Sequence, residues 1–182
     1  MTVNRRSVIK GALAAGVATQ VLKVPGAVAQ AAPLRVGFLT IKTGPLASGG
    51  LQMEQGLTVF FKERNNTLAG RPVELHTADT AGNPAQARTK TQELVERLNV
   101  AVLIGPLAAF EALAIDDYIR SSRTPILSVA GAEDMTQRKP NPWFVRPSST
   151  SAQPSHPLGE YAAKDLKYKR LAVIADDFAF GH

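Results

Sequence analysis

The sequence predicts an α/β fold with a parallel β-sheet. Short apolar runs alternate along the chain with longer segments in which apolar residues recur at helical spacing. The short runs are continuously apolar, which indicates strands buried on both faces, as in a parallel sheet covered by helices. The 182 residues are 45% hydrophobic and 20% charged, which is ordinary for a globular protein.

Strands and helices are expected in alternation over most of the chain. Met53, Leu57 and Phe60 fall at helical spacing after the first apolar run, "LRVGFLT". Asn83 is expected as the N-cap of the second helix, because Pro84 then takes the first helical position. The expected strands are 34–40, 71–80, 100–106 and 124–130, and the expected helices are 51–65, 83–98 and 107–122.

The alternation restarts after a Pro-rich stretch, "KPNPWFVRPSST" at 139–150, which contains one strand-like piece. A helix at about 152–167 and a strand at 170–177, "RLAVIADD", are expected to follow. The sequence stops soon after that strand, where a further helix would begin. We therefore expect a complete first lobe, a crossing segment and a truncated second lobe.

Residues 1–29 have the features of an export signal peptide. Arg5, Arg6 and Lys10 precede the small apolar stretch "GALAAGVATQVL", and "AVA" at 27–29 has the form of a signal-peptidase site. The apolar stretch is shorter than the ~20 residues of a spanning helix, so removal is expected rather than anchoring. "NRRSVIK" resembles the twin-arginine (Tat) motif, which predicts Tat export to the periplasm and leaves the Sec route open.

The charge balance argues against nucleic-acid binding. The formal net charge is +6, but the first 29 residues hold four basic and no acidic residues, which leaves +2 for the remainder. No Lys/Arg stripe with interleaved aromatic residues is present, so no nucleic-acid partner is expected. The sequence contains no cysteine, which excludes disulfides and thiolate chemistry.

Motifs for catalysis, cofactors and metals are missing. "GPLASGG" lacks the Lys and hydroxyl residue of a phosphate loop, and neither it nor "GPLAAF" fits the dinucleotide fingerprint. The three histidines have no ligand spacing, and no serine lies in G-x-S-x-G. Asp116 and Asp117 are expected on a solvated helix face. We therefore expect no cofactor, no metal and no catalytic residue, and the sequence favours binding over catalysis.

The chain resembles the solute-binding proteins of ABC importers, in particular the branched-chain amino acid (Leu/Ile/Val)-binding family with periplasmic-binding fold type I. The stretches that carry the resemblance are "LRVGFLTIKTGPLASGG", "NNTLAGRPVELHTADTAGNPAQARTKTQELVE", "VAVLIGPLAAFEALA", "TPILSVAGAEDMT", "WFVRPSSTSAQ" and "LAVIADDFAFG". It implies two doubly wound α/β lobes joined by a hinge. The first lobe would span 33–145, the crossing segment 146–155 and the start of the truncated second lobe 156–182.

The function that the resemblance implies is capture of a small solute between the lobes and its delivery to an ABC permease in the inner membrane. The protein would be no enzyme, and it would be a monomer when full length. A ligand-sensing receptor domain that regulates a signalling or transcription partner is the alternative, and an exported α/β enzyme is a third. One lobe alone is expected to bind its solute weakly or not at all.

The resemblance also implies a site. In amino acid-binding members the ligand carboxylate would meet the positions of Ala108, Ala109 and Phe110, and the ligand ammonium would meet Ala130, Gly131 and Ala132. Ser48 and Gly49 would form one wall, and Phe180 would contribute from the second lobe. Ala109 and Ala132 stand where hydroxyls would satisfy an amino acid, and an unpaired polar group costs about 1–3 kcal/mol. The sequence therefore favours an apolar or aromatic carboxylate.

Overall fold

A six-stranded sheet runs through the part of the chain that the computed structural model describes, residues 31–177 and 181. The predicted export signal at 1–29 lies outside these residues. The strands are β1 Leu34–Thr40, β2 Thr67–Leu68, β3 Arg71–Asp79, β4 Val102–Ile104, β5 Ile126–Leu127 and β6 Phe144–Val145, in the order β2-β3-β1-β4-β5-β6. Every pair is parallel except the edge pair β2 and β3, which confirms the predicted α/β class.

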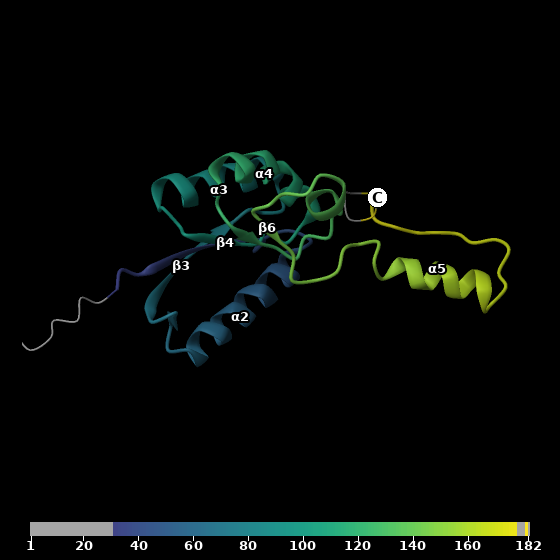
Figure 1. Ribbon diagram of the computed structural model, residues 1–182, viewed down its shortest axis with the longest axis horizontal. Coiled ribbons are helices and arrows are strands. Elements are labelled where there is room, and N and C mark those ends of the chain that lie inside the picture. Colours follow the sequence, from purple (N-terminus) through teal and green to yellow (C-terminus); the bar gives the residue numbers. More distant parts are fainter. Residues whose placement is uncertain (1–30, 178–180, 182) are drawn as a thin grey trace, which may run out of the picture. The chain divides into compact units, whose positions relative to one another are not determined.

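Helices cover both faces of the sheet. The α-helices are α2 Ala47–Glu63, α3 Pro84–Gln92, α4 Ala109–Ser122 and α5 Ser155–Lys164, and η1 Glu93–Arg97 and η2 Asp134–Arg138 are π-helical turns. Figure 1 shows α3 and α4 on one face and α2 on the other, which is the doubly wound arrangement. Asn83 caps α3 by accepting from the amides of Ala85 and Gln86, with Pro84 at the first helical position, as predicted.

The core lies between the sheet and the pair α3 and α4. Its buried members come from β1, β4, β5, β6, both helices and the segments around them. They are Leu39, Ala87, Leu94, Val100, Leu103, Ala112, Ile115, Ile119, Ile126, Ala130, Met135 and Phe144. On the other face, Phe61 of α2 is buried, whereas Leu127 and Val145 remain exposed.

Helix α2 begins four residues before the predicted start. The Gly-rich segment that the sequence suggested as a loop, including Ser48 and Gly49, forms its first turn, and the Ala47 amide donates to the Gly44 carbonyl (3.1 Å). A Cβ at Gly50 would lie 1.9 Å from the Ile41 carbonyl oxygen. Gly50 therefore lets this turn pack directly on the end of β1.

The segment 170–177 contains no strand, contrary to the prediction. Val173 and Ile174 are 88% and 99% exposed. An apolar run becomes a strand only where a neighbouring strand accepts its backbone hydrogen bonds. No such neighbour pairs with it within the described residues.

Asp116 corrects a second prediction. It was expected on a solvated face, but it is only 6% exposed. Its carboxylate accepts from the Arg120 Nε (2.9 Å) and from the Asn141 Nδ2 (2.7 Å). The adjacent Asp117 is exposed as expected, because neighbouring residues of a helix point in different directions.

Candidate functional site

A cavity of ≈ 420 Å³ lies at the carboxyl ends of the central strands. Strand β1 lies between β3 and β4, so the chain leaves β1 toward one edge of the sheet and later returns to the other. In open parallel sheets, this reversal of strand order creates a crevice in which ligands bind. The lining residues are Pro45, Leu46 and Gly49 after β1, Leu107, Ala108 and Ala109 after β4, Val129 and Gly131 after β5, and Asp176.

The N-terminus of α4 forms one wall of this cavity. Ala108 is the N-cap, with extended backbone angles (φ −87, ψ 142), and it offers no side-chain oxygen to cap the helix. The first-turn amides and the helix dipole therefore give this wall a positive potential. The preceding Gly105 has φ 90, and a Cβ there would lie 2.0 Å from the Leu39 carbonyl oxygen. This close approach seats the β4–α4 connection on β1.

The loops after β1 and β3 are tied together by Asp79. Its Oδ1 accepts from the amides of Lys42 and Ala81, both at 2.9 Å, and its Oδ2 accepts from the Thr43 hydroxyl (3.4 Å). Burial raises the pKa of Asp79, but these hydrogen bonds and the Lys42 charge outweigh it, so the pKa lies below the ordinary 3.8. The Asp79 carboxylate is thus a charged structural link in this rim.

Thr40 ties the same strand end to the helix that follows it. Its buried hydroxyl donates to the Gly50 carbonyl (2.9 Å), and its own carbonyl accepts from the Thr80 amide (2.9 Å) and hydroxyl (3.0 Å). The ends of β1 and β3 and the first turn of α2 are therefore joined through one threonine.

The loop after β5 is held by Ser128 and Arg146. The Ser128 hydroxyl donates to the Pro106 carbonyl (2.7 Å) and accepts from the Ala130 amide (3.1 Å). The half-buried Arg146 guanidinium donates to the carbonyls of Ala130 (2.7 Å) and Ala132. Burial lowers the pKa of Arg146, and the Glu133 charge opposes that shift. These contacts fix the third side of the cavity.

Four of the predicted site residues line this cavity: Gly49, Ala108, Ala109 and Gly131. The other predicted residues do not belong to its lining: Ser48 is exposed on α2, Phe110 is half-buried on α4, Ala130 and Ala132 are buried, and Phe180 lies outside the described residues. Leu107 and Val129 line the cavity and were not singled out from the sequence, because Leu107 opens an apolar helical segment, Val129 lies near the end of an apolar run, and both resemble core residues.

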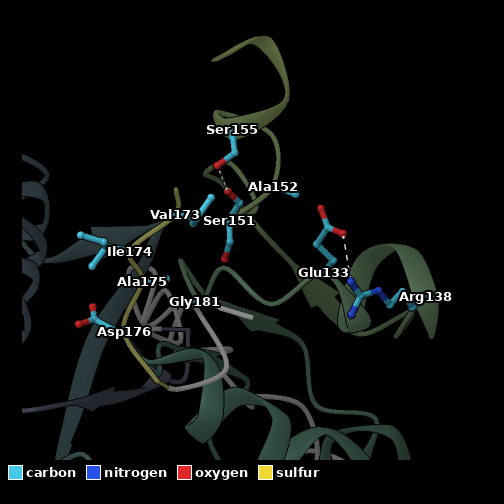
Figure 2. A pocket seen from close by; sticks show the side chains of 10 residues that line it. All are labelled: Glu133, Arg138, Ser151, Ala152, Ser155, Val173, Ile174, Ala175, Asp176 and Gly181. Atoms are coloured by element: carbon cyan, nitrogen blue, oxygen red, sulfur yellow. Dashed lines mark hydrogen bonds and ion pairs between the residues drawn. The ribbon is translucent and has the colours of Figure 1, made fainter. Parts of the chain in front are cut away.

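A second cavity of ≈ 560 Å³ lies between η2, the segment before α5 and the C-terminal segment (Figure 2). Four of its polar lining residues contact one another: Arg138 pairs with Glu133 (3.7 Å), and the Ser155 hydroxyl donates to the Ser151 carbonyl (3.3 Å). Its opposite wall is the irregular 173–176 segment. The cavity at the strand ends is therefore the stronger candidate, since regular elements build it.

Within the described residues, no cluster of three or more His, Cys, Asp or Glu side chains is arranged to hold a metal ion. Among those same residues, no helix has the length and apolar character needed to cross a membrane.

Comparison with known proteins gives a consistent picture. The family model "Periplasmic binding protein" matches residues 33–182. The "Leu/Ile/Val-binding protein homolog 6" of Brucella abortus (strain 2308) is 27% identical over 160 residues, which cover 87% of this chain and 41% of that protein. The chain therefore spans less than half the length of this curated relative.

Solved structures share the fold. A substrate-binding protein of an ABC transporter from Sphaerobacter thermophilus is 35% identical with a TM-score of 0.74, over 82% of this chain and 41% of that one. A solute binding protein of an ABC transporter from Rhodopseudomonas palustris BisB5, in complex with 3,4-dihydroxy benzoic acid, is 31% identical with a TM-score of 0.75, over 82% and 40%. The chain thus belongs to the periplasmic binding protein family, as a type I member of the group that includes the Leu/Ile/Val-binding proteins.

Proposed function

We propose that this chain supplies the first lobe of a periplasmic solute-binding component of an ABC importer, and that it captures a small apolar or aromatic carboxylate. Residues 1–29 would direct export, by the Tat route, and the partner would be an inner-membrane permease. The first lobe would span 33–145, with a crossing segment at 146–155 leading to the second lobe. Binding and release would be the whole activity, without catalysis.

One observation carries the proposed ligand class: the cavity joins an apolar lining to a helix N-terminus. Leu46, Leu107 and Val129 offer apolar surface for a ring, and Ala108 and Ala109 place the first turn of α4 beside it. Amides at a helix N-terminus favour an anion. The aromatic acid bound by the Rhodopseudomonas palustris relative supports the same ligand class.

A branched-chain amino acid is the second candidate, and Asp176 favours it. Asp176 is the charged side chain in the described lining, and its carboxylate would pair with a ligand ammonium. For a simple carboxylate, the same charge would be repulsive. Asp176→Asn should therefore weaken the binding of an amino acid and strengthen the binding of a simple carboxylate, which distinguishes the two ligand classes.

The test is a heteronuclear NMR titration of the 182-residue protein, which detects weak binding residue by residue. Benzoate and 3,4-dihydroxybenzoate are expected to shift the amide resonances of Gly49, Ala109 and Gly131, whereas benzamide and leucine are expected to leave them in place. Asp176→Asn should strengthen benzoate binding, and Asp165→Asn on the exposed end of α5 serves as the control. Shifts with leucine that Asp176→Asn abolishes would instead establish the amino acid ligand. An absence of shifts at these amides with every ligand would reject the site.

A second test removes a single hydrogen-bond donor, the backbone amide of Ala109. Ala109 is the first residue of α4 and Ala108 is extended, so Ala109→Pro is compatible with the helix while it deletes one N–H. We expect weaker benzoate binding with an unchanged unfolding midpoint. Ala109→Ser, which keeps the amide and adds a hydroxyl, is the matched control and should retain benzoate binding. Equal affinity of the Ala109→Pro variant would exclude this amide from the site.

A further inference from the structure

Glu111 places a buried carboxyl group in the first turn of α4. The residue is 0% exposed, and neither carboxylate oxygen has a hydrogen-bond partner within the described residues. Buried carboxylates are normally paired or hydrogen-bonded, because an isolated buried charge is expensive. Burial therefore disfavours the ionised form of this group, and no ion pair within the described residues compensates for it.

The surroundings of Glu111 come from the β3–α3 connection. Thr80, the amides of Asn83 and Ala108, and the carboxylate of Asp79 lie nearest to it among the groups that act on its charge. Burial raises the pKa of Glu111, the Thr80 hydroxyl and the two amides oppose this, and the Asp79 charge adds to the rise. The Thr80 hydroxyl itself donates to Thr40, so it is already committed.

Other charged groups near α4 are engaged elsewhere. The Lys42 ammonium, whose charge lowers the pKa of Asp79, pairs with Glu54 at 2.7 Å. Farther along α4, Arg120 pairs with Asp116.

Charged side chains on the elements that pack on α4 are also paired with other residues. Glu96 of η1 accepts from the Tyr118 hydroxyl (3.0 Å), and Arg138 of η2 pairs with Glu133 and Asp134. No ion pair reaches Glu111 within the described part of the chain.

The same helical turn lines the candidate cavity. Ala108 and Ala109 border the cavity, and Glu111 follows within one turn of about 3.6 residues. Glu111 itself is not part of the lining, but an anion at the α4 N-terminus would lie within about one helical turn of it along α4, and the Glu111 carboxyl is shielded from water. Two like charges in such a site are not both ionised without cost, so the arrival of one favours protonation of the other.

We propose that Glu111 takes up a proton when a ligand carboxylate binds at the α4 N-terminus, so that solute capture is coupled to proton uptake. This inference rests on the proposed carboxylate-binding function. The protein would bind the anion and a proton together, and affinity would rise as the pH falls through the range in which Glu111 titrates. Release of the solute would return the proton.

The direct test measures the titration of Glu111 in the unaltered 182-residue protein. The carboxyl carbon resonance of Glu111 is followed against pH, first alone and then with benzoate at a concentration that saturates the Ala109 amide shift. The midpoint is expected to rise with benzoate, and each unit of that rise corresponds to about a tenfold change in affinity across the transition. An unchanged midpoint, with the amide shift present, overturns proton coupling and leaves the proposed function intact. Absence of the amide shift overturns both.

A pair of variants gives an independent measurement. Glu111→Gln keeps the shape of the side chain and removes its charge, so the part of the pH dependence of benzoate affinity that Glu111 causes should disappear, and the affinity should exceed that of the original protein at pH values where Glu111 is ionised. Glu63→Gln, at the exposed C-terminal end of α2, should retain the original pH dependence. A Glu111→Gln variant that keeps the original pH dependence would overturn the proposal. The carboxyl titration described above uses the unaltered protein, so it tests proton coupling even if the Glu111→Gln variant does not fold.

Discussion

Replacement of Arg146 tests how the loop after β5 is held. The guanidinium donates to the Ala130 carbonyl (2.7 Å), to the Thr136 hydroxyl (2.6 Å) and to the Ala132 carbonyl. Hydrogen bonds to charged groups contribute about 1.5–3 kcal/mol each. Because the side chain is half-buried, water would reach part of the vacated site and recover part of this energy. We therefore expect Arg146→Met to lower the free energy of unfolding by about 2 to 4 kcal/mol.

The assay is chemical denaturation combined with amide hydrogen exchange. Arg146→Lys should recover less than half of the loss, since one ammonium cannot replace a planar fork of donors. Exchange should accelerate at the Ala130 amide, which donates to Ser128 within the same loop. Arg138→Met is the matched control: its side chain is 64% exposed and its ion pairs are long, so little change is expected. A loss below about 0.5 kcal/mol for Arg146→Met would refute the idea that Arg146 holds this loop.

Three further predictions test the fold and its charges. Gly50→Ala should lower the free energy of unfolding by about 2 to 3 kcal/mol, because its Cβ would lie 1.9 Å from the Ile41 carbonyl oxygen. Gly56→Ala should stabilise the protein, since a Cβ there has nothing within 4 Å and alanine favours the helix. Equal denaturation midpoints for the two variants would contradict this packing. Asp116→Ala should cost about 2 to 4 kcal/mol and Asp117→Ala almost nothing, and similar thermal shifts for both would show that the buried pair is unimportant. Burial raises the pKa of Glu111 above its ordinary 4.5, so the native state keeps a proton that the unfolded chain releases. The free energy of unfolding should therefore fall as the pH rises from 4.5 toward the native pKa. Urea denaturation measured against pH should show no such fall for Glu111→Gln.

The elements that the sequence predicted best are those with strong local patterns. Asn83 and Pro84 marked the start of α3, and the continuous apolar run of 34–40 matched β1 residue for residue. The strand expected at 170–177 failed because strand formation depends on a distant partner that no local pattern reveals. The start of α2 was missed because Gly49 and Gly50 suggest a turn, although Gly50 serves close packing within a helix.

The site was predicted in part, through the resemblance and not through periodicity. Ala108 and Ala109 could be placed because the resemblance puts the ligand carboxylate at the start of this helix. Leu107 and Val129 could not be found, since an apolar residue beside a strand or helix end has the same pattern whether it enters the core or lines a cavity. Glu111 was missed for a related reason: an acidic residue in a first turn is ordinary, and its burial arises only when the β3–α3 connection folds over it.

The ties that Asp79, Thr40 and Ser128 make across the strand ends also affect the thermodynamics of binding. Each joins a strand end, or the loop that follows it, to a neighbouring loop or helix start, so the conformational entropy of these backbones is lost when this part of the chain folds. Under the proposed function, a solute would have little ordering left to impose on this wall, and less of its interaction energy would be spent on immobilising the protein. Motion that encloses the solute would then occur outside these loops, as a movement of the lobe as a whole.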